Sequence, residues 1–99
     1  MAKLQVFENP DGQGFLLDVQ SDLIEVLGTR VVVPLLPAGA IPPAIPRLHP
    51  QIDIGGELYV MATQLISAVP TEILAKPMPH QSIDQDQVTA ALDMLFQGF

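Results

Sequence analysis

Apolar and polar positions alternate through much of the first sixty residues, and this pattern predicts β-strands. Residues 4–8 and residues 15–20 each alternate in this way. The sequence Asn9-Pro10-Asp11-Gly12 between them is typical of a turn, because proline presets one backbone angle and glycine accepts a positive φ. We therefore expect a hairpin at the start of the chain.

Three further segments have strand-like patterns. Residues 30–36 are β-branched and apolar, which is typical of a buried strand. Residues 51–54 and 57–62 flank Gly55-Gly56, a pair that favours a tight hairpin turn. Residues 64–69 form another candidate strand, which ends at Pro70. Residues 34–50 contain six prolines, and proline cannot donate to a strand ladder, so we expect a packed loop or an edge excursion there.

The last eighteen residues have the period of an amphipathic helix rather than a strand. Ser82 is the expected N-cap, and Gln85, three positions later, completes a capping box. The acidic Asp84 and Asp86 would complement the helix dipole in the first turn. The apolar residues expected on one core-facing side are Val88, Leu92, Leu95 and Phe96. The pattern thus predicts a β-rich α+β chain with one C-terminal helix.

Composition narrows the class of protein. The 99 residues suit a single domain, and a content of 48% apolar and 15% charged residues favours a homo-oligomer that hides apolar surface. Cysteine is absent and no apolar leader opens the chain, which together suggest a cytoplasmic protein. The longest apolar stretch, residues 31–45, is interrupted by prolines and is too short to span a membrane.

The charge balance disfavours nucleic acid as a direct partner. The formal net charge is −7, and the four basic residues, Lys3, Arg30, Arg47 and Lys76, are scattered along the chain. Binding to phosphates requires clustered lysine and arginine. An acidic protein of this kind suits a basic patch on a partner protein.

Candidate catalytic groups are sparse. His49 and His80 each lie beside a proline without a ligand-spaced partner, so we expect no metal, no cofactor and no catalytic histidine. Asp18, Asp22 and Glu25 form a carboxylate cluster that we interpret as a solvated turn, because paired catalytic carboxylates need burial. The sequence therefore favours a binding protein over an enzyme.

Two places in the sequence are candidates for contact with a partner protein. Leu23 and Ile24 are adjacent apolar residues in a polar loop, and they form either loop packing or an apolar contact patch. Phe99 lies beyond Gly98, outside the helical register, and is either a frayed terminus or a contact residue. The C-terminal end, which offers aromatic residues and a glycine, is the first place to look for function.

Five runs of sequence carry a family resemblance. They are residues 15–24 (FLLDVQSDLI), 28–35 (GTRVVVPL), 48–55, 67–70 (SAVP) and 95–99 (LFQGF). In these runs, which span nearly the whole chain, the protein resembles the CcdB family, the toxin half of a toxin–antitoxin pair that poisons DNA gyrase.

The resemblance implies an SH3-like small barrel with an antiparallel main sheet, a small side sheet and one C-terminal helix. It also implies a homodimer that inserts between the gyrase A subunits and traps the enzyme on cleaved DNA without catalysing a reaction. A CcdA-like antitoxin would bind an overlapping face and displace the toxin from gyrase.

By position, the family's gyrase contacts fall on Leu23, Ile24, Asp93, Gln97, Gly98 and Phe99. Gln97 stands where the family has a tryptophan that stacks on a gyrase arginine, and Asp93 stands where it has an asparagine. Two alternatives therefore stay open: a different target, or a homologue that has lost toxicity. An endoribonuclease toxin on the same type of barrel is a further alternative, disfavoured by the few basic residues.

Overall fold

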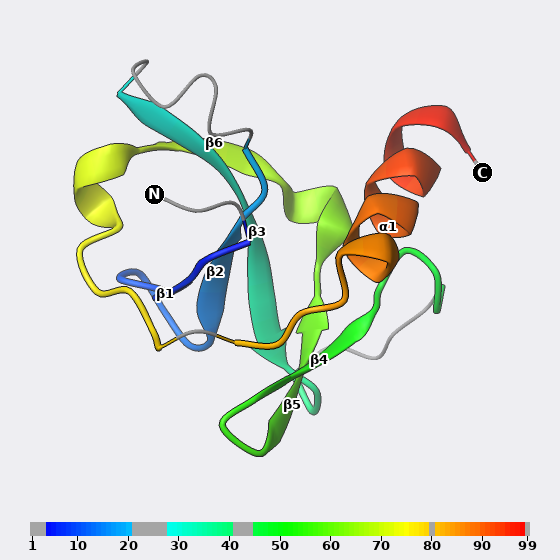
Figure 1. The fold of residues 1–99 in the computed structure, drawn as a ribbon, viewed down its shortest axis with the longest axis horizontal. Helices are drawn as coiled ribbons and strands as arrows, with labels where there is room; N and C mark the ends of the chain where they lie inside the picture. The colour runs from blue at the N-terminus through cyan, green and yellow to red at the C-terminus, as the bar shows by residue number, and fades with distance from the viewer. Residues whose placement is uncertain (1–3, 21–27, 41–44, 80, 99) are drawn as a thin grey trace.

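Antiparallel strand pairing organises the chain, as the ribbon in Figure 1 shows. The computed structural model describes residues 4–20, 28–40, 45–79 and 81–98. Their elements are, in chain order, β1 (Val6–Glu8), β2 (Phe15–Asp18), β3 (Thr29–Pro37), β4 (Gln51–Ile54), β5 (Glu57–Met61), the 3₁₀ turn η2 (Thr63–Leu65), β6 (Ser67–Pro70), the 3₁₀ turn η3 (Thr71–Ile73) and the helix α1 (Gln85–Gln97).

The nine-residue strand β3 is the centre of the sheet, whose strand order is β1-β2-β3-β5-β4. One edge of β3 pairs with β2. The other edge changes partner along its length: residues 29–32 pair with β6, and residues 35–37 pair with β5. The short strand β6 therefore lies outside the main strand order, although it belongs to the same six-stranded sheet.

Strand β3 runs through a proline, so our expectation of a loop from Pro34 onward is wrong for residues 34–37. Pro34 lies where the edge partner changes, and its carbonyl accepts a hydrogen bond from Ala62 N–H (2.9 Å). The reciprocal bond would need the N–H that proline lacks. The Ala62 carbonyl is instead used by Leu65 N–H in η2 (2.9 Å), so no buried acceptor is left over.

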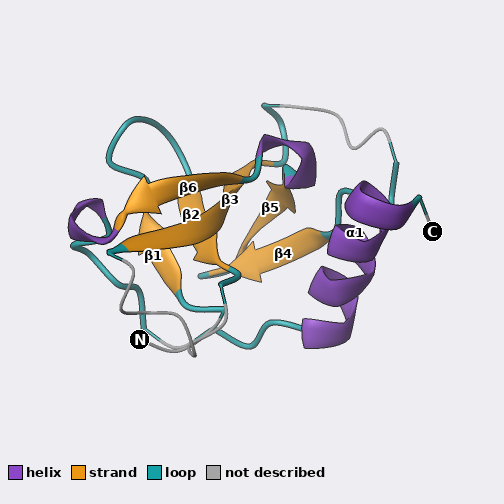
Figure 2. Cartoon of the chain, turned by 90° about the horizontal axis from the view of Figure 1, so that it is seen from above, coloured by secondary structure: helices purple, strands orange, loops and turns teal. Residues whose placement is uncertain are grey.

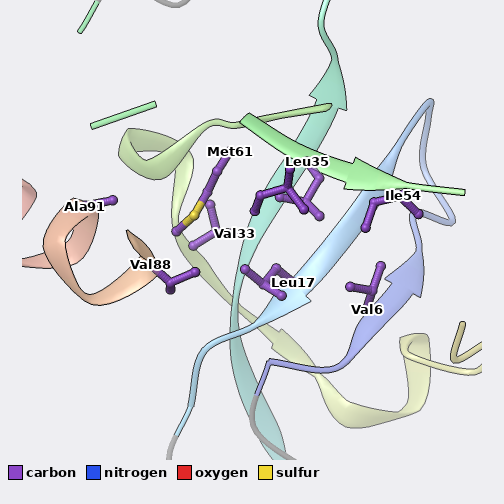
Figure 3. Packing of buried hydrophobic residues seen from close by; sticks show 9 residues of the cluster. Val6, Leu17, Val33, Leu35, Ile54, Met61, Val88 and Ala91 are labelled. Carbon is purple, nitrogen blue, oxygen red and sulfur yellow. The ribbon is translucent and has the colours of Figure 1, made fainter. Parts of the chain in front are cut away.

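The sheet curls around one apolar core. Val6 of β1 and Ile54 of β4 belong to the same buried cluster, although these strands lie at opposite ends of the strand order. Figure 3 shows both side chains pointing inward beside Leu17 and Leu35. The whole cluster is Val6, Leu17, Val33, Leu35, Ile52, Ile54, Met61, Val88 and Ala91. The curl confirms the expected mainly β, small-barrel fold with a C-terminal helix.

A second, smaller cluster covers the other face of the sheet. It consists of Phe7, Leu16, Val32 and Leu74, with Ile73 packed at its edge. The turn η3 delivers Leu74 to this face after β6 ends. Side chains alternate across a strand, so Asp18 and Arg30 lie on the same face as Leu16 and Val32.

Both expected hairpins are present. Strands β1 and β2 pair antiparallel, and β4 and β5 are joined by Gly55 and Gly56. Both glycines have positive φ, 63° and 91°, as the tight turn requires. The strand expected over residues 64–69 starts later, at Ser67, because η2 occupies Thr63–Leu65. In the described part of the chain, no helix is long and apolar enough to cross a bilayer.

Candidate functional site

Helix α1 closes the core from the β4 end of the sheet, as Figure 2 shows. Val88 and Ala91 are buried and point toward Met61 and Val33 (Figure 3). Leu92 packs partly buried against the same cluster. These contacts fix the helix, and everything on its opposite side faces solvent.

Phe96 does not belong to the core, so our expectation for this residue is wrong. Its side chain is 69% exposed, whereas Leu95 is half-buried. The buried residues of the helix are Val88 and Ala91, and Phe96 lies about 80° from Val88 and about 140° from Ala91 around the helix axis. The small Ala91, which the apolar pattern did not include, is buried instead.

The N-cap of the helix is Asp84 rather than the expected Ser82. The Asp84 carboxylate accepts hydrogen bonds from the backbone N–H groups of Asp86 (3.0 Å) and Gln87 (3.3 Å). Two of the N–H groups that a helix start leaves without partners are thereby satisfied.

The helix ends at Gly98, which adopts a left-handed conformation with φ 82°. Its N–H donates to the Met94 carbonyl at 3.0 Å, closing the last turn. Asp93, Phe96 and Gln97 precede it, all exposed. Asp93 and Gln97 are four residues apart and therefore share one side of the helix. We call the group Asp93, Phe96, Gln97 and Gly98 the helix tip.

Three of the six predicted contact residues lie together at the helix tip: Asp93, Gln97 and Gly98. The other three, Leu23, Ile24 and Phe99, lie outside the described residues. Phe96, which joins the tip as an exposed aromatic side chain, is a surface residue that the apolar pattern missed. The helical period alone hints at this exposure, because Phe96 lies at the edge of the predicted apolar stripe rather than at its centre.

A buried ion pair lies at the end of β2. Arg30 Nε donates to Asp18 Oδ2 at 2.8 Å, and the two residues are only 1% and 0% exposed. Our interpretation of Asp18 as part of a solvated turn is therefore wrong. The signal was available in the strand pattern, because Asp18 and Gln20 continue the face of Leu16, which is buried.

His49 is buried and has a structural role. Its Nδ1 accepts a hydrogen bond from Ile45 N–H (3.3 Å), so the proton resides on Nε2, which donates to Gln64 Oε1 (2.8 Å). His49 lines an open pocket of about 300 Å³ beside Gln51 and Gln87. With both ring nitrogens engaged, it offers the pocket neither a base nor a metal ligand. Among the described residues, no three histidine or acidic side chains gather into a metal site.

The arrangement therefore suits binding by shape: an exposed helix tip on a rigid barrel. The sequence profile of the family described as CcdB protein matches residues 3–98. The chain belongs to the CcdB family. CcdB proteins are toxins that poison DNA gyrase rather than catalyse a reaction themselves, and the helix tip is where the family resemblance assigns the target contact.

Proposed function

We propose that this protein is the toxin of a toxin–antitoxin pair, that it binds the A subunit of DNA gyrase and traps the enzyme on cleaved DNA, and that a CcdA-like antitoxin neutralises it. The observation that carries the proposal is the CcdB family match across residues 3–98. In this proposal Leu23, Ile24, Asp93, Gln97, Gly98 and Phe99 contact the target.

The geometry of the helix tip supports the proposal. The N-cap at Asp84 and the buried Val88 and Ala91 hold the helix in place. The tip can therefore meet a partner without first being ordered, which lowers the entropic cost of binding.

The charge of the tip indicates which target group it would bind. Asp93 and Gln97 lie one turn apart and are both exposed. A guanidinium placed between them would pair with the Asp93 carboxylate and donate a hydrogen bond to the Gln97 amide oxygen. In this chain an arginine of the target would thus be held by an ion pair instead of by stacking on tryptophan.

A supercoiling and DNA-cleavage assay with purified gyrase tests the function directly. We expect the protein to accumulate cleaved DNA and to lose this effect when the antitoxin is added. A growth-arrest assay on induced expression is the companion measurement. Arrest without any effect on gyrase would favour a different target, and no arrest would favour a homologue without toxicity. These two alternatives are considered because Asp93 and Gln97 stand where the family has asparagine and tryptophan.

Restoring the family's aromatic residue gives a sharper test. Gln97→Trp should strengthen gyrase inhibition by roughly 5- to 30-fold, because an aromatic face over a guanidinium contributes on the order of 1–2 kcal/mol. Thr89→Trp is the matched control, since Thr89 is exposed on the same helix two turns before Gln97. Equal inhibition by the wild type and both variants would argue against an arginine of gyrase as the contact.

An endoribonuclease function has less support. Of the basic residues that the structure describes, Arg30 is buried in an ion pair, while Arg47 and Lys76 are exposed singly. Binding an RNA backbone needs a positive groove. Incubation of the purified protein with messenger RNA, with no cleavage expected, separates this function from gyrase poisoning.

A further inference from the structure

Strands at the edge of a sheet carry backbone groups that can pair with an extended segment of another chain. In the described part of this protein, such strands are β1, β6 and β4. The edge of β1 is already covered, because Glu8 N–H donates to the Lys76 carbonyl (3.1 Å) and Met78 N–H donates to the Val6 carbonyl (2.8 Å). Residues 76–78 thus take the place of a further strand.

The edge of β6 offers little to a partner. The Val31 carbonyl accepts from Val19 N–H on the β2 side (3.0 Å), so Ala68, which lies opposite Val31, directs its own backbone groups away from β3. Pro70, the other residue of β6 on that side, has no N–H to donate. Strand β6 therefore presents a single outward N–H.

The edge of β4 is open over its whole length. The Pro50 carbonyl accepts from Met61 N–H (3.0 Å), and pairing alternates along an antiparallel ladder, so the next residue, Gln51, and then Asp53 direct their N–H and C=O groups away from β5. Both residues are exposed, and none of the described residues hydrogen-bonds to these outward groups. The edge thus presents two donors and two acceptors.

An open pocket of about 300 Å³ adjoins the start of this edge. It is lined by the rings of Pro46, His49 and Pro50 and by the amide side chains of Gln51 and Gln87. The rings supply apolar surface, and each amide can donate and accept hydrogen bonds. A peptide lying along β4 could therefore place an apolar side chain in the pocket.

The charges beside the edge indicate which partner it suits. Asp53 of β4 and Glu57 of β5 are both exposed, and neither carboxylate forms a salt bridge with a described residue. A second copy of this chain paired along β4 would bring further carboxylates to the same place, where like charges repel. Lysine or arginine side chains would be attracted there.

We propose that the β4 edge and the pocket beside it form a docking site for an extended, basic segment of a partner protein. The segment adds a strand to the sheet, and its backbone pairs with Gln51 and Asp53. Its basic side chains lie against Asp53 and Glu57. The site lies on a different element from the helix tip, so it does not depend on the proposed function.

A synthetic peptide that alternates lysine and valine is the probe, with amide chemical shifts and Kd as the readouts. Binding should shift the amide signals of Gln51 and Asp53. The same peptide with methylated backbone nitrogens cannot donate to the edge, and it should bind about tenfold more weakly. Absence of binding by the unmodified peptide, or equal binding by the methylated one, overturns the proposal.

Proline substitutions distinguish the two edges. Gln51→Pro removes an outward donor and leaves the ladder to β5 intact, so the Kd for the lysine–valine peptide should rise about tenfold. Ala68→Pro removes the outward donor of β6 and is the matched control, with no change expected. Equal losses would overturn the assignment to β4. If Gln51→Pro but not Ala68→Pro lowers the mass in sedimentation, the edge pairs with a second copy and the proposal fails.

Charge removal tests the same site without altering the backbone. In Asp53→Asn/Glu57→Gln, the asparagine oxygen can still accept from Gly56 N–H, as Asp53 Oδ1 does (2.8 Å). Affinity for the peptide should fall roughly 3- to 10-fold at low salt, and less at high salt. Asp11→Asn/Glu72→Gln changes the net charge equally at other exposed positions and should leave the affinity unchanged. Equal effects of the two double variants contradict the proposed site.

Discussion

At the scale of single residues, one carboxylate decides where the helix begins. Ser82 and Asp84 are both accepted N-cap residues, and they lie only two positions apart. Ile83, which lies between them, packs partly buried against the core. Because this packing depends on residues far away in the sequence, the local pattern could not select Asp84.

Removing each candidate cap separates the two possibilities. Asp84→Ala should lower the free energy of unfolding by about 1 kcal/mol, because two backbone N–H groups lose their acceptor. Ser82→Ala, at an exposed position, should change it by less than about 0.5 kcal/mol. Urea denaturation of the two variants beside wild type measures both values. A larger loss for Ser82→Ala would contradict the cap assigned here.

The buried Asp18 shows what the alternation of apolar and polar residues along one strand leaves out. The alternation of residues 15–20 predicted a strand correctly, and Asp18 was assigned to a solvated turn. Asp18 and Gln20 instead face the second cluster, where Arg30 meets them from β3. Alternation places Asp18 and Gln20 on the face of the buried Leu16, but an ion pair is a contact between distant positions, so alternation within one strand does not identify Arg30 as the partner.

At the scale of elements, the helix is held to the sheet by a narrow contact. Val88 and Ala91 are its buried residues, and Val88 is only 2% exposed. The amphipathic period predicted this helix and its core-facing side. It could not show that Ala91 is buried while Phe96 is exposed, because a small residue adds little to an apolar pattern.

Truncating that contact should loosen the helix. Val88→Ala should destabilise the protein by about 2 kcal/mol, through lost apolar burial and the cavity left behind. Thr89→Ala, one position along on the exposed side, should stay within about 0.5 kcal/mol of wild type. Thermal unfolding measures both. Similar values for the two variants would mean that the helix does not depend on this packing.

The central strand β3 shows a second feature that the sequence pattern could not predict at the scale of elements. Six prolines over residues 34–50 argued for a loop, yet β3 continues through Pro34 to Pro37. The strand tolerates Pro34 because the Ala62 carbonyl, to which proline cannot donate, accepts a hydrogen bond from Leu65 N–H in η2 instead. That compensation comes from thirty-one residues further along the chain, beyond any local rule.

At the scale of the whole molecule, the strand order and curl follow from contacts that only the folded chain reveals. The hairpins and the helix could be predicted from local signals. The closure that brings Val6 and Ile54 into one core could be expected only through the family resemblance. At the candidate site, sequence placed Asp93, Gln97 and Gly98 on the helix end, and the structure brings them together with the exposed Phe96.

The oligomeric state is a prediction at this same scale. We expect a homodimer, so sedimentation should give about twice the chain mass of 10.7 kDa. Each copy carries a net charge of −7, and like charges repel, so salt should strengthen the self-association by screening. A particle of one chain mass at micromolar concentrations, at both low and high salt, would rule out the dimer.

The position of Val88 and Ala91 in the core has a consequence during protein synthesis. The barrel cannot complete its interior until these late residues have left the ribosome, and the candidate contact tip follows them directly. A nascent chain therefore lacks both a finished core and a presented tip. Binding through the tip would therefore begin only after this helix has emerged and packed against the sheet.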